Sequence, residues 1–282
     1  MELITKINKL KAVVRKTRCA GEQIGFVPTM GALHEGHLTL VKRARTVADR
    51  VVVSIFVNPL QFGQGEDFDK YPRNLSHDLE LLTRCGVDYL FAPAAEEFYP
   101  KDFETSVAVS DLSDKLCGKF RPGHFKGVTT VVAKLFALVE PDIAFFGQKD
   151  AQQALILKRM ARDLRFQARL QVCPTVREED GLAMSSRNVY LSPEQRRAAP
   201  VLYRALGRAA GKILEGERQT ARARQAALDL LAAEPSIRLE YLEIVDTATL
   251  EPPELLRGHL LIAVAAYLGQ TRLIDNLLVC VP

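Results

Sequence analysis

Two histidines, His34 and His37, lie in a short segment between an apolar stretch and a helical pattern. The stretch Ile24–Val27 predicts a strand, and the later apolar spacing predicts the buried side of a helix, through Leu38, Leu40, Val41 and Ala44. Backbone N–H groups and the positive end of the helix dipole point outward at such a junction, which suits a phosphate. Two glycines in Pro28–His37 permit a tight turn and close approach of the backbone to a ligand. The segment therefore predicts a phosphate-binding turn.

The same histidines leave two other interpretations open. A His-x-x-His pair could hold a metal ion, but the zincin pattern needs one-turn spacing and a glutamate base. Here the spacing is shorter and a glycine intervenes, so we do not expect a metal site built from protein ligands. Alternatively, both are surface histidines on a helix cap.

Three further polar segments follow predicted strands or lie near a predicted domain boundary. Asn58 and Gln61 follow the β-branched run Val51–Val57, and their neutral amides both donate and accept hydrogen bonds. This segment is either part of a binding site or an ordinary Asn-Pro turn.

The second segment ends in Lys149 and Asp150, after the apolar stretch Ile143–Phe146. The lysine is a candidate point charge for a phosphate, and the aspartate would accept from ribose hydroxyls or cap a helix. The third segment, Val176–Asn188, contains two hydroxyls followed by an arginine. It is either a mobile phosphate clamp or a polar interdomain loop.

Alternating strand and helix patterns run through the first 175 residues or so. They predict an α/β fold with a doubly wound parallel sheet, in which ligands bind beyond the carboxyl ends of the strands. After a helix start at Ser192-Pro193, a helical region reaches about Ala233. Three strand-like stretches follow, with a hairpin turn at Gly269-Gln270. We therefore expect a Rossmann-like domain over 1–176 and a smaller α+β domain over 177–282.

Composition excludes several classes of protein. The 282 residues are 48% hydrophobic and 26% charged, and no apolar run approaches the ~20 residues of a membrane helix. The first residues lack a signal-peptide core, so we expect a cytoplasmic protein with no membrane partner. The net charge of +4 and 7% aromatic residues do not indicate a nucleic-acid surface. We expect the basic residues between Arg204 and Arg224 to form a solvated helix face.

The five cysteines are widely spaced and odd in number, so neither disulfides nor a zinc site is expected. We interpret them as buried core residues. Neither a Walker loop nor a Gly-x-Gly-x-x-Gly fingerprint occurs, which disfavours a P-loop ATPase and a standard dinucleotide dehydrogenase.

Taken in order, these segments resemble the motifs of the pantothenate synthetase (pantoate–β-alanine ligase) family. That family belongs to the nucleotidylyltransferases related to class I aminoacyl-tRNA synthetases. The similarity extends over nearly the whole chain, and its motifs are Pro28–His37, Phe56–Phe62, Tyr71–Arg73, Arg121–Val128, Phe145–Asp150 and Asp180–Asn188. His77 departs from the pattern, since many relatives have an acidic residue there, and the roles of positions 77 and 78 stay open.

The resemblance implies that the carboxylate of (R)-pantoate attacks ATP to give pantoyl adenylate and pyrophosphate. The amine of β-alanine then gives pantothenate and AMP. It also implies Mg²⁺ held mainly by phosphates and water, and a homodimer. His37, His34 and Lys149 would be catalytic, with His37 resembling the proton donor of the family.

The remaining residue roles are implied by the same resemblance. Those expected to contact ATP are Met30, Gly31, Ala32, Leu33, His34, Glu35, Gly36, His37, Gly147, Gln148, Lys149, Asp150, Val176, Met184, Ser185, Ser186 and Arg187. Those expected to contact pantoate or β-alanine are Gln61, Gln153, Asn58, Arg121 and His124. An amide suits pantoate because it orients the attacking carboxylate at less cost in nucleophilicity than a cation would.

Two rival functions remain. One is another nucleotidylyltransferase, acting on phosphopantetheine or an alcohol phosphate, but amides at Gln61 and Gln153 suit hydroxyls and a carboxylate better than a phosphate. The other is a nucleotide- or RNA-binding module without catalysis. The paired histidines and Lys149 disfavour that module.

Overall fold

The computed structural model describes all residues from 1 to 282, and the chain divides into two compact units. Unit 1 comprises Met1–Ser113, Arg121–Gly147 and Ile156–Pro174, and unit 2 comprises Asp114–Phe120, Gln148–Leu155 and Thr175–Pro282. Two short pieces of the first 176 residues are thus grouped with the C-terminal part. The two compact units do not have the bounds of the predicted domains, so the division into domains 1–176 and 177–282 stays a prediction.

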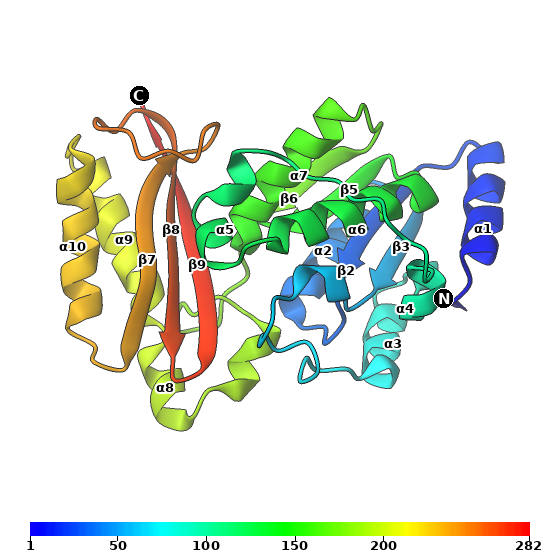
Figure 1. Ribbon diagram of the computed structural model, residues 1–282, viewed down its shortest axis with the longest axis horizontal. Helices are drawn as coiled ribbons and strands as arrows, with labels where there is room; N and C mark the ends of the chain where they lie inside the picture. Colours follow the sequence, from blue (N-terminus) through cyan, green and yellow to red (C-terminus); the bar gives the residue numbers. More distant parts are fainter. The chain divides into compact units, whose positions relative to one another are not determined.

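Unit 1 contains the predicted doubly wound sheet, in which six parallel strands have the order β1-β4-β3-β2-β5-β6 (Figure 1). In that order the strands are Glu2–Ile4, Tyr89–Phe91, Arg50–Ile55, Ile24–Thr29, Ile143–Gly147 and Arg169–Cys173. The order reverses between β2 and β5. Ligands of such sheets bind beyond the carboxyl ends of the strands at this reversal, where the turn after β2 begins.

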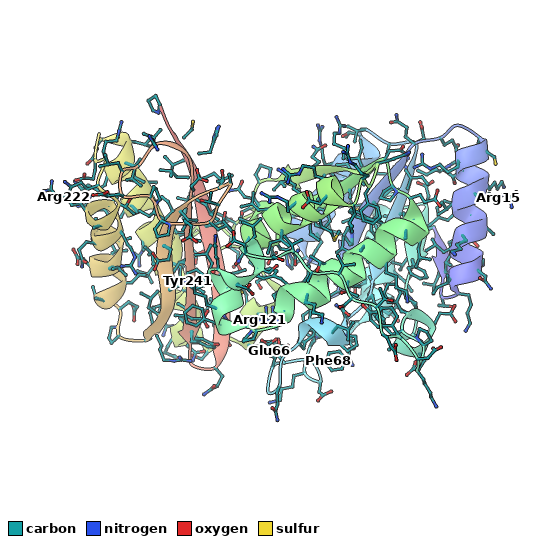
Figure 2. All side chains as sticks on the ribbon, turned by 45° about the horizontal axis from the view of Figure 1, so that its top comes forward. Arg15, Glu66, Phe68, Arg121, Arg222 and Tyr241 are labelled. Carbon is teal, nitrogen blue, oxygen red and sulfur yellow. The ribbon has the colours of Figure 1, made fainter.

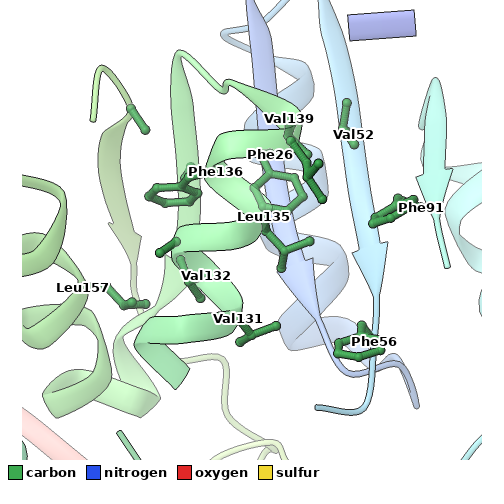
Figure 3. Packing of buried hydrophobic residues seen from close by; sticks show 14 of the residues in the cluster. Phe26, Val52, Phe56, Phe91, Val131, Val132, Leu135, Phe136, Val139 and Leu157 are labelled. Atoms are coloured by element: carbon green, nitrogen blue, oxygen red, sulfur yellow. The ribbon is translucent and has the colours of Figure 1, made fainter. Parts of the chain in front are cut away.

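Helices cover both faces of this sheet, and α2 and α6 lie on opposite faces (Figure 1). The helices that contribute to unit 1 are α1 (Ile7–Cys19), α2 (Glu35–Arg45), α3 (Leu75–Arg84), α4 (Ala95–Phe98), α6 (His124–Val139) and α7 (Ala151–Asp163). Phe26 of β2 packs edge-on against Phe136 of α6, with ring centroids 6.4 Å apart (Figure 3). Val52 joins that cluster, whereas Val51 and Val53 join the cluster on the other face. The β-branched run is therefore buried on both sides, as predicted.

Unit 2 is built on an antiparallel sheet of three strands, β7 (Ile237–Asp246), β8 (Gly258–Leu268) and β9 (Thr271–Val281). Helices α9 (Val201–Leu214) and α10 (Thr220–Ala232) cover one face of this sheet (Figure 1). The hairpin turn predicted at Gly269-Gln270 connects β8 to β9, and Gly269 has a φ of +59°.

Three details differ from expectation. The helical region after Ser192 is three helices, because α8 (Pro193–Ala198) ends before Pro200 and α9 ends before Gly216, whose φ is +106°. The N-terminal β1 and α1 were not predicted. Cys117 and Cys173 are buried, but Cys19 and Cys280 are exposed, so the prediction of five core cysteines was wrong for those two.

The remaining elements are short, namely the helix α5 (Cys117–Phe120) and the 3₁₀ turns η1 (Pro59–Gln61), η2 (Leu112–Asp114), η3 (Gln148–Asp150) and η4 (Ser186–Tyr190). Among the basic side chains of α9 and α10, Arg204, Arg208 and Arg222 are exposed, as expected of a solvated face; Figure 2 labels Arg222. Arg224 is half-buried and donates to the Leu242 carbonyl oxygen and to Glu243 of β7, so the expectation was wrong for this residue. None of the helices is both long and apolar enough to cross a membrane.

Candidate active site

The turn after β2 leads directly into α2, and both histidines take part in the helix cap. His34 is the N-cap residue, and its Nδ1 accepts a hydrogen bond from the Gly36 N–H at 3.1 Å. The His37 Nδ1 accepts from the His34 N–H at 3.3 Å, and the ring centroids lie 4.1 Å apart. Because each Nδ1 lone pair accepts a hydrogen bond from a backbone N–H, the neutral rings carry their own hydrogen on Nε2. Capping thus fixes the tautomer in which each ring has an Nε2 donor.

The Asp78 side chain of α3 holds the backbone of the same turn in place by accepting hydrogen bonds from it. Its Oδ2 accepts from the Ala32 N–H at 3.0 Å, and its Oδ1 accepts from the Leu33 N–H at 2.8 Å. Gly31 has a φ of +81°, and a Cβ at this position would lie 3.0 Å from Asp78 Oδ2. Burial raises the pKa of the Asp78 carboxyl, and the two backbone hydrogen bonds and the charge of His77 only partly offset this effect. The sequence analysis left the role of this residue open.

Three other residues of unit 1 that are predicted to contact ATP are Met30, Glu35 and Gly147, and their surroundings differ. Glu35 pairs with Lys42 at 2.5 Å on an exposed face. Met30 extends toward the next turn, where its Sδ accepts from Gln61 Nε2 at 3.0 Å. Gly147 ends β5, and a Cβ there would meet nothing within 4 Å.

The turn after β3 contains the predicted substrate amides. Asn58 caps η1 through a hydrogen bond from the Leu60 N–H at 3.3 Å. Asn58 Nδ2 donates to Gln61 Oε1 and to the Gly127 carbonyl oxygen, both at 3.1 Å. The Asn58 side chain is 1% exposed, so in this structure it orients Gln61. Its own contact with substrate stays a prediction.

Helix α6 approaches this turn unusually closely at one residue. A Cβ on Gly127 would lie 2.1 Å from the carbonyl oxygen of Leu60 and 2.6 Å from the backbone nitrogen of Gln61. Real side chains cannot occupy such positions, so glycine is required for the approach. The predicted motif Arg121–Val128 thus contains a residue that sets the position of Gln61.

Arg121 and His124, at the start of α6, also contact this turn. His124 Nδ1 donates to the Gln61 carbonyl oxygen at 2.8 Å, and His124 Nε2 accepts from Arg121 Nη1 at 3.2 Å. Arg121 forms a two-point ion pair with Glu66, at 2.7 Å and 2.5 Å (Figure 2). Burial opposes the Glu66 charge, but Arg121 outweighs it and holds the Glu66 pKa below its ordinary value. Sequence reasoning missed Glu66, since nothing local marks it.

In unit 2, Lys149 lies in η3, whose backbone is held by β9. Asn276 Nδ2 donates to the carbonyl oxygens of Gln148 and Lys149, both at 2.9 Å. Burial is the main cause that lowers the pKa of Lys149, and the charge of Arg187 lowers it further. The charges of Asp150 and Asp275 act in the opposite direction. Two predicted phosphate-binding cations therefore influence each other within this unit.

The segment Val176–Asn188 is anchored to the same strand. Arg177 forms a two-point ion pair with Asp275, at 2.6 Å and 3.0 Å, and its guanidinium lies 3.8 Å from the Tyr203 ring centroid. The Met184 N–H donates to the Val176 carbonyl oxygen at 3.0 Å, which joins two residues predicted to frame adenosine.

Later in this segment, Ser185 is the N-cap residue of η4, and Ser186 and Arg187 are the first two residues of η4. The remaining predicted residues of this unit are exposed Asp150, beside Lys149, and half-buried Gln153, in the first turn of α7. The histidine turn and Gln61 belong to unit 1 and these residues to unit 2, so their shared action on one substrate set stays a prediction.

The six-stranded parallel sheet, with the histidine-capped helix α2 after its central strand β2, has the nucleotidylyltransferase fold. The sequence model of the pantoate-beta-alanine ligase family matches residues 2–278, and the chain belongs to this family. The expected resemblance is therefore confirmed, and with it a ligase that joins pantoate and β-alanine. The two rival functions lose their support.

Individual relatives agree with this assignment. The chain is 57% identical over 279 residues to pantothenate synthetase of Heliobacterium modesticaldum, covering 99% of both chains. A crystal structure of pantothenate synthetase from Thermus thermophilus has a TM-score of 0.94 and 51% identity, covering 98% of this chain and 99% of that one. Pantoate-beta-alanine ligase from Francisella tularensis, complexed with beta-gamma ATP and beta-alanine, has a TM-score of 0.80 and 33% identity. That match covers 99% of this chain and 97% of the other.

Proposed function

We propose that the chain condenses (R)-pantoate with β-alanine and ATP in two steps. The pantoate carboxylate attacks the α-phosphorus, which forms pantoyl adenylate and releases pyrophosphate. The β-alanine amine then attacks the acyl carbon, forms the amide of pantothenate and expels AMP. Family membership supports the ligation, and the Francisella complex supports ATP and β-alanine as substrates.

The observation that carries this proposal is the tautomer of the paired histidines. Since Nδ1 of His34 and of His37 accepts a backbone hydrogen bond, Nε2 is the donor on each ring. Fixed donors at the helix N-terminus stabilise the negative charge that develops on the triphosphate during nucleotidyl transfer. His37 is the candidate proton donor to this charge.

Gln61 is the proposed pantoate ligand of unit 1. Its Oε1 accepts from Asn58, and one hydrogen of its NH₂ group points to Met30 Sδ, so the second hydrogen is the proposed donor to the carboxylate or hydroxyl oxygens of pantoate. A neutral donor holds the carboxylate in position for attack without neutralising it. The contacts of Arg121 and His124 with the Gln61 turn favour a role for both on this substrate side, and β-alanine contacts by these residues stay part of the proposal.

In unit 2, Lys149, Ser185, Ser186 and Arg187 are proposed to bind the phosphates and the departing pyrophosphate. A cationic Lys149 is needed for this role, and its lowered pKa makes the charge easier to lose as the pH rises. Gln153 is proposed as the second pantoate amide. Asp150, Val176 and Met184 would frame the ribose and adenine.

Mg²⁺ is proposed to accompany ATP, with phosphate oxygens and water as its main ligands. The chain contains no group of three or more His, Cys, Asp or Glu side chains placed to hold a metal ion, and we assign no protein ligand to Mg²⁺. When bound, the ion would neutralise phosphate charge. A cytoplasmic homodimer is also part of the proposal, as the family resemblance implies.

Pantoate labelled with oxygen-18 in its carboxylate tests the two-step route. The protein is incubated with labelled pantoate, β-alanine and ATP, and the masses of AMP and pantothenate are measured by mass spectrometry. If the carboxylate attacks the α-phosphorus, AMP carries one heavy oxygen and pantothenate retains the other. Unlabelled AMP formed together with pantothenate would contradict the acyl-adenylate intermediate, and no pantothenate at all would contradict the ligase function.

Two substitutions of His37 distinguish the role of Nδ1 in the helix cap from the role of Nε2 as a hydrogen-bond donor. An asparagine amide matches the position of Nδ1, so His37→Asn should keep the cap and lose the Nε2 donor. We expect adenylation to fall roughly a hundredfold with an unchanged melting temperature. A glutamine reaches the Nε2 position, so His37→Gln should retain more activity. Near-normal pyrophosphate release by His37→Asn would remove this residue from the catalytic group.

A further inference from the structure

A chain of hydrogen bonds links Gln61 to Tyr99, a residue to which the proposed mechanism assigns no contact with substrate. The Tyr99 hydroxyl, just after α4, donates to Asn58 Oδ1 at 3.0 Å, and Asn58 Nδ2 donates to Gln61 Oε1 at 3.1 Å. Tyr99 and Asn58 are 41 residues apart in the sequence. All three side chains belong to unit 1.

The donors and acceptors in this chain allow one orientation of each amide. Asn58 Oδ1 accepts from the Leu60 N–H and Asn58 Nδ2 donates to the Gly127 carbonyl oxygen, so a flipped Asn58 would set donor against donor and acceptor against acceptor. The Tyr99 hydroxyl is the second donor to this fixed Oδ1. A flipped Gln61 would likewise turn its NH₂ group toward that of Asn58 and would lose its donation to Met30 Sδ. An unmade hydrogen bond at a buried polar group is costly, so the orientation passes along the chain.

We propose that Tyr99 is a positioning residue that acts through Asn58 to present the NH₂ group of Gln61, and not its carbonyl oxygen, to pantoate. The inference rests on the proposed pantoate role of Gln61. A fixed NH₂ group selects a substrate that offers an oxygen acceptor, such as a carboxylate or hydroxyl. It disfavours the amide or amine analogue that would place a donor there.

Packing holds the Tyr99 ring in place while its hydroxyl acts. Its ring centroid lies 4.9 Å from that of Phe98 and 4.8 Å from that of Phe103. The ammonium group of Lys134 lies 5.1 Å from the Tyr99 centroid and 4.6 Å from the Phe103 centroid. Burial also raises the pKa of the Tyr99 hydroxyl, which keeps it protonated and able to donate.

Tyr99→Phe removes the hydroxyl and retains the ring. We expect the KM for pantoate to rise roughly three- to tenfold, the scale of one hydrogen bond, with unchanged kcat and unchanged KM for ATP. A merely structural role would lower the melting temperature and alter all kinetic constants together. Tyr89→Phe is the matched control, because the Tyr89 hydroxyl takes no part in this chain and its substitution should leave both KM values unchanged.

A double-mutant cycle with Gln61→Ala decides whether Tyr99 acts through Gln61. If it does, Tyr99→Phe should have almost no further effect on the KM for pantoate in the Gln61→Ala background. The same fold-change in both backgrounds would overturn the inference. An unchanged KM for pantoate in Gln61→Ala alone would remove the proposed pantoate role of Gln61 and this inference with it. Product formation by the unsubstituted enzyme tests the ligase function separately.

Discussion

The turn after β2 and the turn after β3 are each held by one buried polar side chain, but the two side chains differ in kind. Asp78 accepts two backbone N–H groups, and Asn58 both accepts and donates. An ionised carboxylate can only accept, so its influence ends at the backbone of the turn. The amide of Asn58 also donates, and this donated hydrogen bond determines which end of the Gln61 amide faces Asn58. The carboxylate therefore shapes a turn, whereas the amide also decides which end of Gln61 is presented.

The difference also concerns charge. Asp78 lies beneath a turn whose histidine donors are proposed to bind phosphates, and its charge is directed at backbone N–H groups. Asn58 brings no charge to Gln61, the proposed ligand of an attacking carboxylate. A carboxylate in place of Asn58 would have repelled that substrate. Each brace thus suits the ligand proposed for its own turn.

Gly127→Ala should give the largest effect and should break only the turn after β3. Its methyl group would overlap the backbone of Leu60 and Gln61, so the turn or the helix must move. A displacement of about 1 Å costs on the order of a hundredfold in rate. We expect that loss in kcat/KM for pantoate, measured by pyrophosphate release, with a much smaller change in the KM for ATP.

Gly207→Ala is the matched control for Gly127→Ala. Gly207 also lies within a helix, but a Cβ there would meet nothing within 4 Å. Alanine in a helix is favoured over glycine by up to about 1 kcal/mol, so this variant should be as stable as the parent or more so. Equal, small effects of both substitutions would contradict the close approach of α6 to the turn.

Asp78→Asn should break the turn after β2 and spare the turn after β3. An asparagine offers one acceptor and turns an NH₂ group toward a backbone N–H, so one of the two hydrogen bonds is lost. We expect about 2 kcal/mol of lost stability in urea unfolding, together with slower adenylation at saturating pantoate. The exposed neighbour His77 provides the control, since His77→Ala should change stability by less than about 0.5 kcal/mol. If His77→Ala has the larger effect, Asp78 is not the brace.

Asn276→Leu extends the comparison to a third turn, in unit 2. Asn276 is again a neutral amide, but it donates to the carbonyl oxygens of Gln148 and Lys149 and so holds a cation in place. Removing both hydrogen bonds leaves two carbonyl oxygens unpaired and should raise the KM for ATP roughly tenfold or more. The KM for pantoate should change less. An effect confined to pantoate would mean that this amide does not position Lys149.

The local parts of this architecture were predictable from the sequence, and the braces were not. The β-branched run Val51–Val57 and the glycine-histidine turn Pro28–His37 are contiguous patterns, so strand, turn and helix could be inferred from them. Asp78 meets Leu33 across 45 residues, and Asn276 meets Gln148 across 128. No local pattern reports such a pairing. It depends on which strands become neighbours.

Some misses had a local signal that was available. Pro200 and Gly216 interrupt the helical pattern after Ser192, and proline and glycine are the usual breaks of a helix. By contrast, β1 has only three residues, Glu2–Ile4, and exists because it pairs with β4. Gly127 could be seen as a glycine inside a helical pattern, but its reason is a backbone from another segment.

The smallest predicted effect compares two carboxylates of unit 1 by their pH dependence. Burial raises the pKa of Asp78 above 3.8, so the folded protein binds this proton more readily than the unfolded chain does. Its contribution to the free energy of unfolding therefore grows as the pH falls toward 3.8. For Glu66, Arg121 outweighs burial and lowers the pKa below 4.5, so its contribution is complete above 4.5 and is lost as the pH falls further.

Urea unfolding of the parent, Asp78→Asn and Glu66→Gln between neutral pH and about pH 3 measures both slopes. The difference in unfolding free energy between parent and Asp78→Asn should grow on acidification, and that between parent and Glu66→Gln should shrink. Opposite signs would separate a carboxylate at which burial prevails over its backbone hydrogen bonds and the charge of His77 from one neutralised by an arginine. Slopes of the same sign would mean that the backbone hydrogen bonds and the charge of His77 outweigh burial at Asp78, as Arg121 does at Glu66, and the contrast between the two carboxylates would be lost.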